Sequence, residues 1–394
     1  MSFIASAGTL VLNSNQSDPV PKAAFAEIIK QFEKENPDIK VKQTIFDHEA
    51  YKTALRNWLT TSPPDVVHWY AGNRMKQFVS RNLFEDVSDI WQEEKLDTHM
   101  ASSLAAMTIN EKQWGVPFSY YQWGVYYRKD LFKKFSIKEP KTWKEFLAAC
   151  EGLKKNGIAP IAIGTKYLWT AAGWFDHLNL RINGLAFHLD LMDGKIPYTD
   201  PRVKEVFNTW KQLVEPDYFL ANHATYSWQE GHSFMLNGKA GMYLLGNFIT
   251  HNFGDKKNLM GFFPFPQINP KVARSEDAPM DTIHIPAKAK NKKDARRFLT
   301  FMARADVQSK LNSKIGQIPP HAQATTTSNY FLDKGVEMLK TSAGTAQFYD
   351  RDTSPAMAKE GMKGFQEFMV KPERLEKILK RLERARKREF GRRS

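Results

Sequence analysis

The stretch SPPDVVHWYAGNRM at residues 62–75 combines two prolines, a carboxylate, two aromatic rings and an amide around a short apolar run. The prolines end any preceding helix, because proline has no amide N–H and restricts the residue before it. The two valines that follow are typical of a short buried strand, and Gly72 allows the chain to turn. The stretch therefore predicts that a helix ends, a buried strand follows and the chain then turns.

Side chains able to bind a ligand flank this predicted strand. Asp65 lies at its entrance, and Trp69, Tyr70 and Asn73 lie just past its end. Ligands of open α/β sheets are held beyond the carboxyl ends of the strands. A ring for stacking and an amide for hydrogen bonding are the groups that a carbohydrate requires. The alternative is a loop whose rings only pack.

Strand and helix signals alternate through the first part of the chain. A strand at 9–13 is followed by a helix with apolar residues at 25, 28, 29 and 32, and a second strand begins near Ile39. A helix over 49–59 then precedes the strand at Val66. This order predicts an α/β fold with a mainly parallel sheet and helices on both faces.

Length and composition limit the class of protein. A chain of 394 residues fits two lobes better than one compact domain. The one cysteine, Cys150, rules out an intrachain disulfide and is predicted to be a buried apolar residue in a helix capped by Thr142 and Glu145. No apolar run is long enough to span a membrane. No P-loop, zinc-ligand spacing or serine-hydrolase elbow occurs.

The net charge of +14 is concentrated at the end of the chain. Residues 371–394 hold eleven Lys and Arg against four Glu. Apolar residues recur there at helical spacing, at Leu375, Ile378, Leu379, Leu382 and Ala385. We expect a terminal helix that docks by this stripe and leaves its basic residues in water, rather than an arm that binds nucleic acid.

Three extended, aromatic or proline-rich stretches are candidates for crossings between lobes. They are WGVPFSYYQWGVYYRKDLF (114–132), GFFPFPQINP (261–270) and IGQIPPHAQA (315–324). We find no internal repeat or low-complexity tract.

The order of these segments resembles the family-1 extracellular solute-binding proteins of carbohydrate ABC importers, the maltose- and oligosaccharide-binding kind. The likeness extends from Thr9 to about Phe390. The matching stretches are FEKENPDIKV (32–41), PPDVVHWYAGN (63–73), the 114–132 crossing, PKTWKEFLAACEGLKKNGIAPIAIG (140–164), FMLNGKAGMYLLGNF (234–248) and DTIHIPAKAKNKKDARRFLTFMA (281–303).

The resemblance implies a two-lobed, type II periplasmic-binding-protein fold, in which three strands form a hinge and the ligand lies in the cleft. The expected lobes are residues 1–120 with 278–318 and residues 121–277 with 319–394, the second ending in the basic helix. The expected partners are a sugar or glycoside, possibly charged, and the transmembrane subunits of an ABC permease, with no nucleic acid, no cofactor and no metal. The start, MSFIASAGTLVLNS, lacks the features of a signal peptide. By itself this start suits either a cytoplasmic protein or one whose signal has been removed. With the resemblance, we expect a monomer in the periplasm or outside the cell, its signal removed.

The candidate ligand-binding residues are rings, amides, carboxylates and an arginine at predicted strand ends, crossings and helix starts. Carboxylates, amides and Arg satisfy sugar hydroxyls, and rings cover the apolar faces. Arg351 would also suit an anionic group on the ligand. The set comprises Gln16, Asp65, Trp69, Asn73, Tyr121, Gln122, Trp169, Trp174, Asp176, Trp228, Asn247, Phe248, Asp281, Phe348, Asp350, Arg351 and Asp352.

Two other functional classes use the same residues. A glycoside hydrolase needs two carboxylates across one bond, and Asp350 with Asp352 is one such pair. A protein-interaction scaffold would place the rings on a flat surface. We expect a receptor with no catalytic residues.

Overall fold

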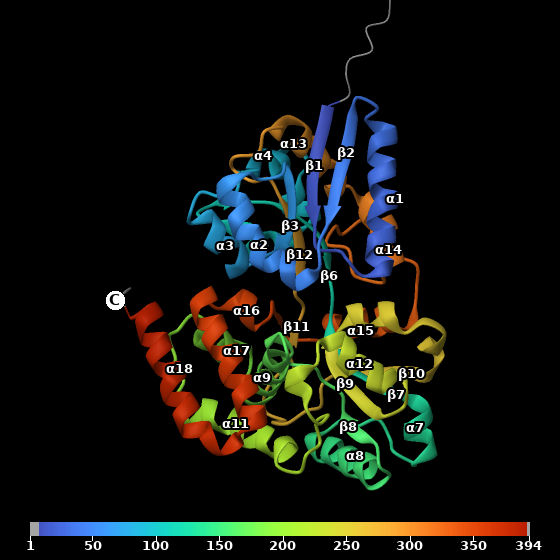
Figure 1. The fold of residues 1–394 in the computed structure, drawn as a ribbon, viewed down its shortest axis with the longest axis vertical. Coiled ribbons are helices and arrows are strands. Elements are labelled where there is room, and N and C mark those ends of the chain that lie inside the picture. Colours follow the sequence, from blue (N-terminus) through green and yellow to red (C-terminus); the bar gives the residue numbers. More distant parts are fainter. Residues whose placement is uncertain (1–7, 392–394) are drawn as a thin grey trace, which may run out of the picture. The chain divides into compact units, whose positions relative to one another are not determined.

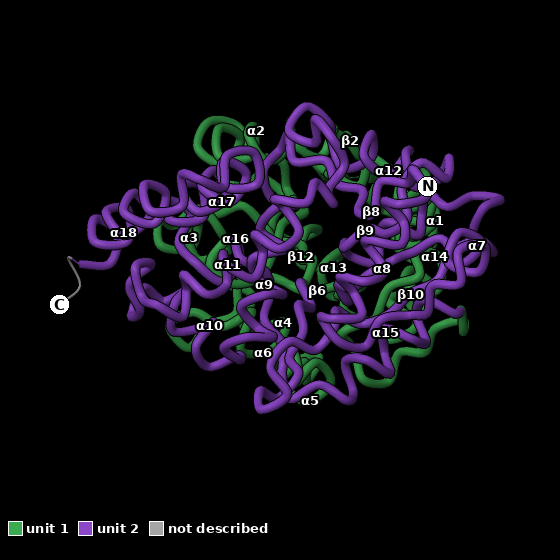
Figure 2. The backbone as a smooth tube through the Cα atoms, turned by 90° about the horizontal axis from the view of Figure 1, so that it is seen from below, with its two compact units in different colours: residues 1–120, 280–329 green, residues 121–279, 330–394 purple. Residues whose placement is uncertain are grey.

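The computed structural model describes residues 8–391, and the chain divides into two compact units (Figure 2). Unit 1 comprises residues 1–120 and 280–329, and unit 2 comprises residues 121–279 and 330–394. The first seven residues, which belong to the segment behind the expectation of a removed signal, lie outside the described part.

Unit 1 is built on a five-stranded mixed sheet in the order β2-β1-β3-β12-β6. β1 pairs in parallel with β2 and β3, whereas β12 runs antiparallel to both β3 and β6. The mainly parallel sheet predicted from the first strands therefore gains an antiparallel strand from a distant segment. The strands are β1 (Gly8–Ser14), β2 (Ile39–Ile45), β3 (Val66–Tyr70), β6 (Val116–Tyr120) and β12 (Met280–His284).

Helices cover both faces of this sheet. Successive side chains of a strand point to opposite sides, so a strand that is buried throughout must be covered on both faces. In β3, the His68 ring lies 4.8 Å from Phe25 of α1, between ring centroids. Its neighbour Trp69 lies against Tyr51 of α2 and Phe78 of α3 instead. Figure 1 shows α1 beside α14 and, on the other side of the sheet, α2 beside α3. The helices are α1 (Pro19–Glu35), α2 (His48–Thr61), α3 (Asn73–Val79), α4 (Ser88–Glu93), α5 (Leu96–His99), α6 (Ala101–Met107), α13 (Lys292–Ala303) and α14 (Ala305–Ile315). A short hairpin joins β4 (Thr108–Ile109) to β5 (Lys112–Gln113).

Unit 2 is built on a four-stranded sheet in the order β10-β7-β9-β8. β7 is antiparallel to both of its neighbours, and β8 is parallel to β9. The strands are β7 (Trp123–Arg128), β8 (Ala159–Ile161), β9 (Ala240–Gly246) and β10 (Met260–Phe263), and a two-stranded sheet pairs β11 (Glu276–Asp277) with β13 (Thr345–Ala346).

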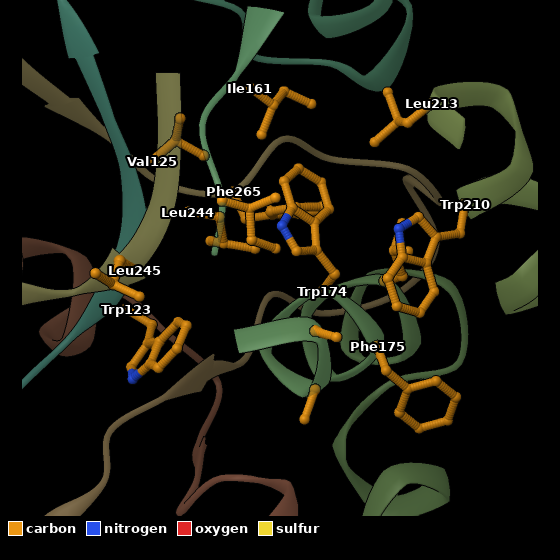
Figure 3. Close-up of a cluster of buried hydrophobic side chains, with 14 of the residues drawn as sticks. Trp123, Val125, Ile161, Trp174, Phe175, Trp210, Leu213, Leu244, Leu245 and Phe265 are labelled. Carbon is orange, nitrogen blue, oxygen red and sulfur yellow. The ribbon is translucent and has the colours of Figure 1, made fainter. Parts of the chain in front are cut away.

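The helices of unit 2 pack around α9, which is buried almost throughout. Figure 3 shows Trp174 of α9 between the sheet residues Val125 and Leu244 and the α11 residues Trp210 and Leu213. The helices are α7 (Lys129–Lys134), α8 (Trp143–Lys155), α9 (Trp169–Ile182), α10 (Leu185–Met192), α11 (Pro201–Val214), α12 (Trp228–Leu236), α15 (Tyr330–Lys340), α16 (Tyr349–Asp352), α17 (Pro355–Val370) and α18 (Leu375–Phe390), with 3-10 turns η1 (His223–Thr225), η2 (Asn247–Asn252), η3 (Gly254–Leu259) and η4 (Pro372–Arg374).

The chain passes between the units at 120/121, 279/280 and 329/330, so two of the expected crossings are wrong. The GFFPFPQINP stretch stays in unit 2, because its first residues lie in β10 and pair with β7. The IGQIPPHAQA stretch stays in unit 1. The segment after it remains there too, because the Thr325 and Thr327 amides donate to Ser309 and Ser313 of α14.

Local signals in the sequence agree with the structure more closely. Thr142 and Glu145 form the expected capping box at the start of α8. Cys150 is buried, and burial raises the pKa of its thiol. In α18 the five predicted apolar residues are all buried. None of the described helices combines the length and apolar composition needed to cross a membrane.

Gly173 of α9 tests how tightly this helix packs on the sheet. A Cβ added there would lie 2.4 Å from the Trp123 ring, closer than side chains can approach. We expect Gly173→Ala to lower the free energy of unfolding by about 1–3 kcal/mol, measured by urea denaturation. Gly152→Ala in α8 is the matched control, since its nearest neighbour is the flexible end of Ile137 at 3.3 Å. Equal stability of the two variants would contradict the packing.

Candidate functional site

A group of polar side chains gathers where β1 and β3 end in unit 1. The Asn15 amide nitrogen donates to the Tyr70 hydroxyl at 3.1 Å, and that hydroxyl lies 3.2 Å from His48 Nε2. Gln16 donates to the Asn15 oxygen at 3.2 Å. Asp281 of β12 is the cross-strand partner of Tyr70, which puts both side chains on one face of the sheet. These five residues form the polar group. The candidate set contained Gln16 and Asp281, and Tyr70 was noted beside the predicted strand, whereas Asn15 and His48 were missed.

Asp65 performs a structural task at the other end of β3. Its carboxylate accepts from the backbone N–H of Val11 at 2.9 Å and of Asn291 at 2.8 Å, and it is 5% exposed. It thus joins β1, β3 and the start of α13. Its predicted role in ligand binding has no support in this arrangement.

Trp69 lies within β3 and not past its end, which corrects the expected strand boundary. The side chain is 1% exposed, and its indole N–H donates to the carbonyl of Arg74 at 2.9 Å. Its ring packs between α2 and α3 and therefore belongs to the core of unit 1. Asn73 is half-buried as the first residue of α3.

Aromatic rings from five separate segments of unit 2 meet around Phe248, just after β9. The ring of Phe248 lies 5.3 Å from Trp228, 5.4 Å from Tyr121 and 6.1 Å from Trp169, between centroids. Trp123 contacts the same group at 6.4 Å from Phe248, and Phe348 stacks on Trp123 at 4.8 Å. These six residues form the aromatic group. Five of them are sequence candidates, and the sixth, Trp123, was missed.

The exposed fractions divide this group into two kinds of ring. Trp169 and Phe248 are half-buried, whereas Tyr121, Trp123, Trp228 and Phe348 are 2–6% exposed. Since stacking requires an open ring face, the first two are the rings suited to contact a ligand, and the others hold them in place.

Trp123 carries a polar atom whose hydrogen bonding is incomplete. Its indole nitrogen is buried and has no acceptor among the described residues. A buried donor without an acceptor costs about 1–3 kcal/mol. The atom is therefore a candidate donor to an oxygen of a bound molecule or water.

Polar side chains accompany these rings. Arg351 donates to the Tyr121 hydroxyl at 3.1 Å, and Asn247 accepts from the Tyr126 hydroxyl at 2.9 Å. Gln122 donates to the carbonyl of Phe331 at 3.1 Å, which ties the first crossing to α15. Asp350 is 7% exposed beside Arg351 in α16. The group thus offers rings, amides, an arginine and a carboxylate.

Asp352 accepts from the backbone N–H groups of Gln347 and Phe348, at 2.8 and 3.2 Å. Burial raises the pKa of Asp352 to about 6. Because its carboxylate holds the turn before α16, it has a structural task, and the structure gives no support to Asp350 and Asp352 as a catalytic pair.

Trp174 and Asp176 are fully buried in α9, away from any surface. Asp176 accepts from the Tyr349 N–H at 2.7 Å, and burial, then Asp277, raise the pKa of its carboxyl. Both residues thus belong to the interior of unit 2.

Asp277 has no hydrogen bond to either carboxylate oxygen among the described residues, and it is 0% exposed. The nearby His177 donates its Nδ1 hydrogen to the Gly173 carbonyl, and burial lowers the pKa of His177 to about 3, so this ring is neutral at pH 7. Burial raises the pKa of Asp277 well above its usual value, helped by Asp352 and Glu276.

Comparison with known proteins identifies the family. A family model described as bacterial extracellular solute-binding protein matches residues 16–309. The chain belongs to this family. It is a solute receptor and not an enzyme, of the kind that serves ABC importers, as its sequence resemblance implied. Among residues 8–391, no group of His, Cys, Asp and Glu side chains is arranged to hold a metal ion.

Individual relatives agree with this family. An uncharacterized ABC transporter extracellular-binding protein of Pyrococcus horikoshii is 30% identical over 77% of this chain and 69% of its own length. The multiple sugar-binding protein of Streptococcus mutans is 26% identical over 73% of this chain and 70% of its own.

A solved structure, that of the bacterial solute receptor AcbH, matches with a TM-score of 0.91 and 29% identity, covering 97% of this chain and 99% of that chain. AcbH has an exclusive preference for β-D-galactopyranose. The chain described here, with its two mixed sheets, therefore has the α/β periplasmic-binding-protein fold.

Substitution of Trp69 distinguishes a core ring from a ligand-binding ring. We expect Trp69→Ala to lower the free energy of unfolding by about 3–5 kcal/mol, because it removes a buried indole. The Kd of the folded variant for a sugar ligand should change less than about twofold. Loss of a ring that contacts the ligand would instead raise the Kd about tenfold, or 1.4 kcal/mol. Thermal unfolding and calorimetry measure the two effects, and a selective loss of affinity would restore Trp69 to the site.

Asp277→Asn tests the effect of the buried carboxyl on stability. The folded state holds this proton more tightly than the unfolded state, so its stabilising contribution is present below about pH 4 and is lost as the pH rises through the folded-state pKa. We therefore expect the stability of the variant, relative to the wild type, to increase between about pH 4 and pH 8.

Urea titrations at several pH values measure this change, and Asp255→Asn, at an exposed carboxylate of the same unit, is the control. A pH-independent difference between Asp277→Asn and the wild type would contradict the raised pKa of Asp277.

Proposed function

We propose that this receptor is the substrate-binding component of an ABC importer and that it captures a sugar or glycoside. The aromatic group of unit 2 is the observation that carries the proposal. Half-buried Trp169 and Phe248 offer ring faces to the C–H faces of a sugar, while Arg351, Asp350 and Asn247 lie on neighbouring segments. Relatives that bind β-D-galactopyranose or several sugars support the same substrate class.

Each unit, taken by itself, holds groups that suit a sugar. In unit 2 the rings would supply much of the affinity, because they remove apolar surface from water. In unit 1 the polar group around Tyr70 offers amide, imidazole, hydroxyl and carboxylate atoms, which match sugar hydroxyls that both donate and accept. Selectivity would come from these polar atoms, since an unmatched buried partner costs about 1–3 kcal/mol.

In this proposal the sugar favours a closed state of the receptor, which the permease then recognises. A ligand shifts that equilibrium only by its greater affinity for the closed state. Support comes from the family and from the three places where the chain passes from one unit to the other.

Titration calorimetry against D-galactose, D-glucose, maltose, raffinose and D-glucuronic acid tests the proposal. We expect at least one of these to bind with a Kd in the micromolar range, about −8 kcal/mol. Comparison of D-glucuronic acid with D-glucose tests whether Arg351 favours a ligand that carries an anionic group. Binding no tighter than millimolar to every member of the panel would overturn the proposed substrate class.

Trp169→Ala tests the role of the half-buried rings. Loss of a stacking face should weaken binding of the sugar found in the panel by at least about tenfold, or 1.4 kcal/mol. Tyr167→Ala is the matched control, because this ring lies two residues away and is 43% exposed. Its affinity should stay within about twofold of the wild type. Equal losses in the two variants would refute a specific role for the aromatic group.

A further inference from the structure

Helix α18 carries a row of basic side chains that solute binding does not use. Lys377, Lys380, Arg384, Lys387 and Arg388 are all exposed, and none forms an ion pair with another described residue. At 100° per residue these five positions fall within an arc of about 100° on one side of the helix. We call them the basic stripe.

Two of the three acidic side chains of α18 have partners outside this stripe. Glu376 pairs with Lys204 of α11, and Glu383 pairs with Arg386 at 2.7 Å. Glu383 also accepts from the Tyr198 N–H at 2.9 Å, so it faces the interior of unit 2. The third, Glu389, falls about 100° around the helix from the nearer edge of the stripe, so the stripe presents a net positive charge.

The opposite face of α18 packs the helix against the rest of unit 2 by its apolar side chains. Leu375, Ile378, Leu379, Leu382 and Ala385 are buried, and Figure 1 shows α18 beside α17 at the outside of unit 2. Gly364 of α17 lets the two helices approach closely, because a Cβ there would lie 3.1 Å from Ile378. Since the apolar residues supply the packing, the basic residues are free to serve another purpose.

We propose that the basic stripe binds the surface of a bilayer that contains anionic phospholipids. The five charges extend over about 16 Å of a rigid helix, and neighbouring charges lie within one Debye length, so their attractions to a charged surface add. Each Lys or Arg near an anionic leaflet contributes measurably to such attraction. Lipid headgroups are mobile and can adjust to the fixed spacing of the stripe.

The composition of the stripe favours this partner over others. It holds no aromatic ring for stacking on bases and no apolar side chain for insertion into a partner or a bilayer. Binding would therefore be peripheral, reversible and sensitive to salt. The proposed importer works beside a membrane, so such a surface lies within reach of the receptor.

Sedimentation with lipid vesicles tests the proposal on the full chain. We expect binding to vesicles of phosphatidylcholine with about 30% phosphatidylglycerol at about 25 mM NaCl, and at least tenfold weaker binding at about 300 mM NaCl. Vesicles of phosphatidylcholine alone should not bind. Failure of the wild type to bind the anionic vesicles would overturn the proposal.

A stripe variant and a charge-matched control identify the surface responsible. The stripe variant combines Lys377→Gln, Lys380→Gln, Arg384→Gln and Lys387→Gln, and we expect its vesicle partition coefficient to fall at least about tenfold. The control combines Lys22→Gln, Lys42→Gln, Lys144→Gln and Lys239→Gln, four exposed lysines outside α18, and should bind within about twofold of the wild type.

Three further results would count against the stripe. These are equal losses in the two variants, unchanged binding by the stripe variant, and a wild type that binds duplex DNA under these conditions but not vesicles. Circular dichroism and sugar titration of both variants verify that each is folded. Because vesicle binding needs no sugar, its outcome is independent of the proposed solute.

Discussion

The alignment of β7 with β9 is the constraint on which the binding chemistry of unit 2 depends. Trp123 pairs with Gly246 across these strands, so the first residue of one strand lies opposite the last of the other. A Cβ on Gly246 would lie 2.5 Å from Phe248 and 2.9 Å from Tyr121, which means that only glycine leaves room for both rings. A shift of one residue would turn these side chains to the opposite face. The aromatic group thus follows from strand register.

Buried charges are organised around the second chain crossing, and they differ in how they are satisfied. Glu276 receives two hydrogen bonds from Arg181 at 2.8 Å and one from Arg274 at 2.7 Å. Its neighbour Asp277 has none among the described residues. Paired charges inside a protein fix geometry, whereas an unpaired carboxyl avoids its desolvation cost by holding a proton. The same strand therefore contains one fixed ion pair and one carboxyl that responds to pH.

Periodic and local features were predictable from the sequence, because they depend on neighbouring residues. The buried stripe of α18, the capping box of α8 and the strand after the two prolines are of this kind. The crossings at 261–270 and 315–324 were not predictable, since membership of a unit depends on distant partners such as β7 and α14. Likewise, the structural role of Asp65 could not be recognised before the hydrogen bond from the backbone N–H of Asn291 to its carboxylate was known. Its carboxylate suits either role, and only the fold decides between them.

The tryptophans show why composition alone cannot locate a binding site. Trp174 and Trp210 fill the core of unit 2, and Trp69 does the same in unit 1, whereas Trp169 keeps part of its ring open at the start of α9. Trp169 and Trp174 lie in the same apolar-rich stretch, YLWTAAGWF (167–175). What separates them is that Trp174 lies in the middle of a helix buried on all sides, while Trp169 is its first residue. Place in a helix does not decide alone, because Trp228 also begins a helix and is only 6% exposed, so the surrounding fold determines which ring keeps an open face.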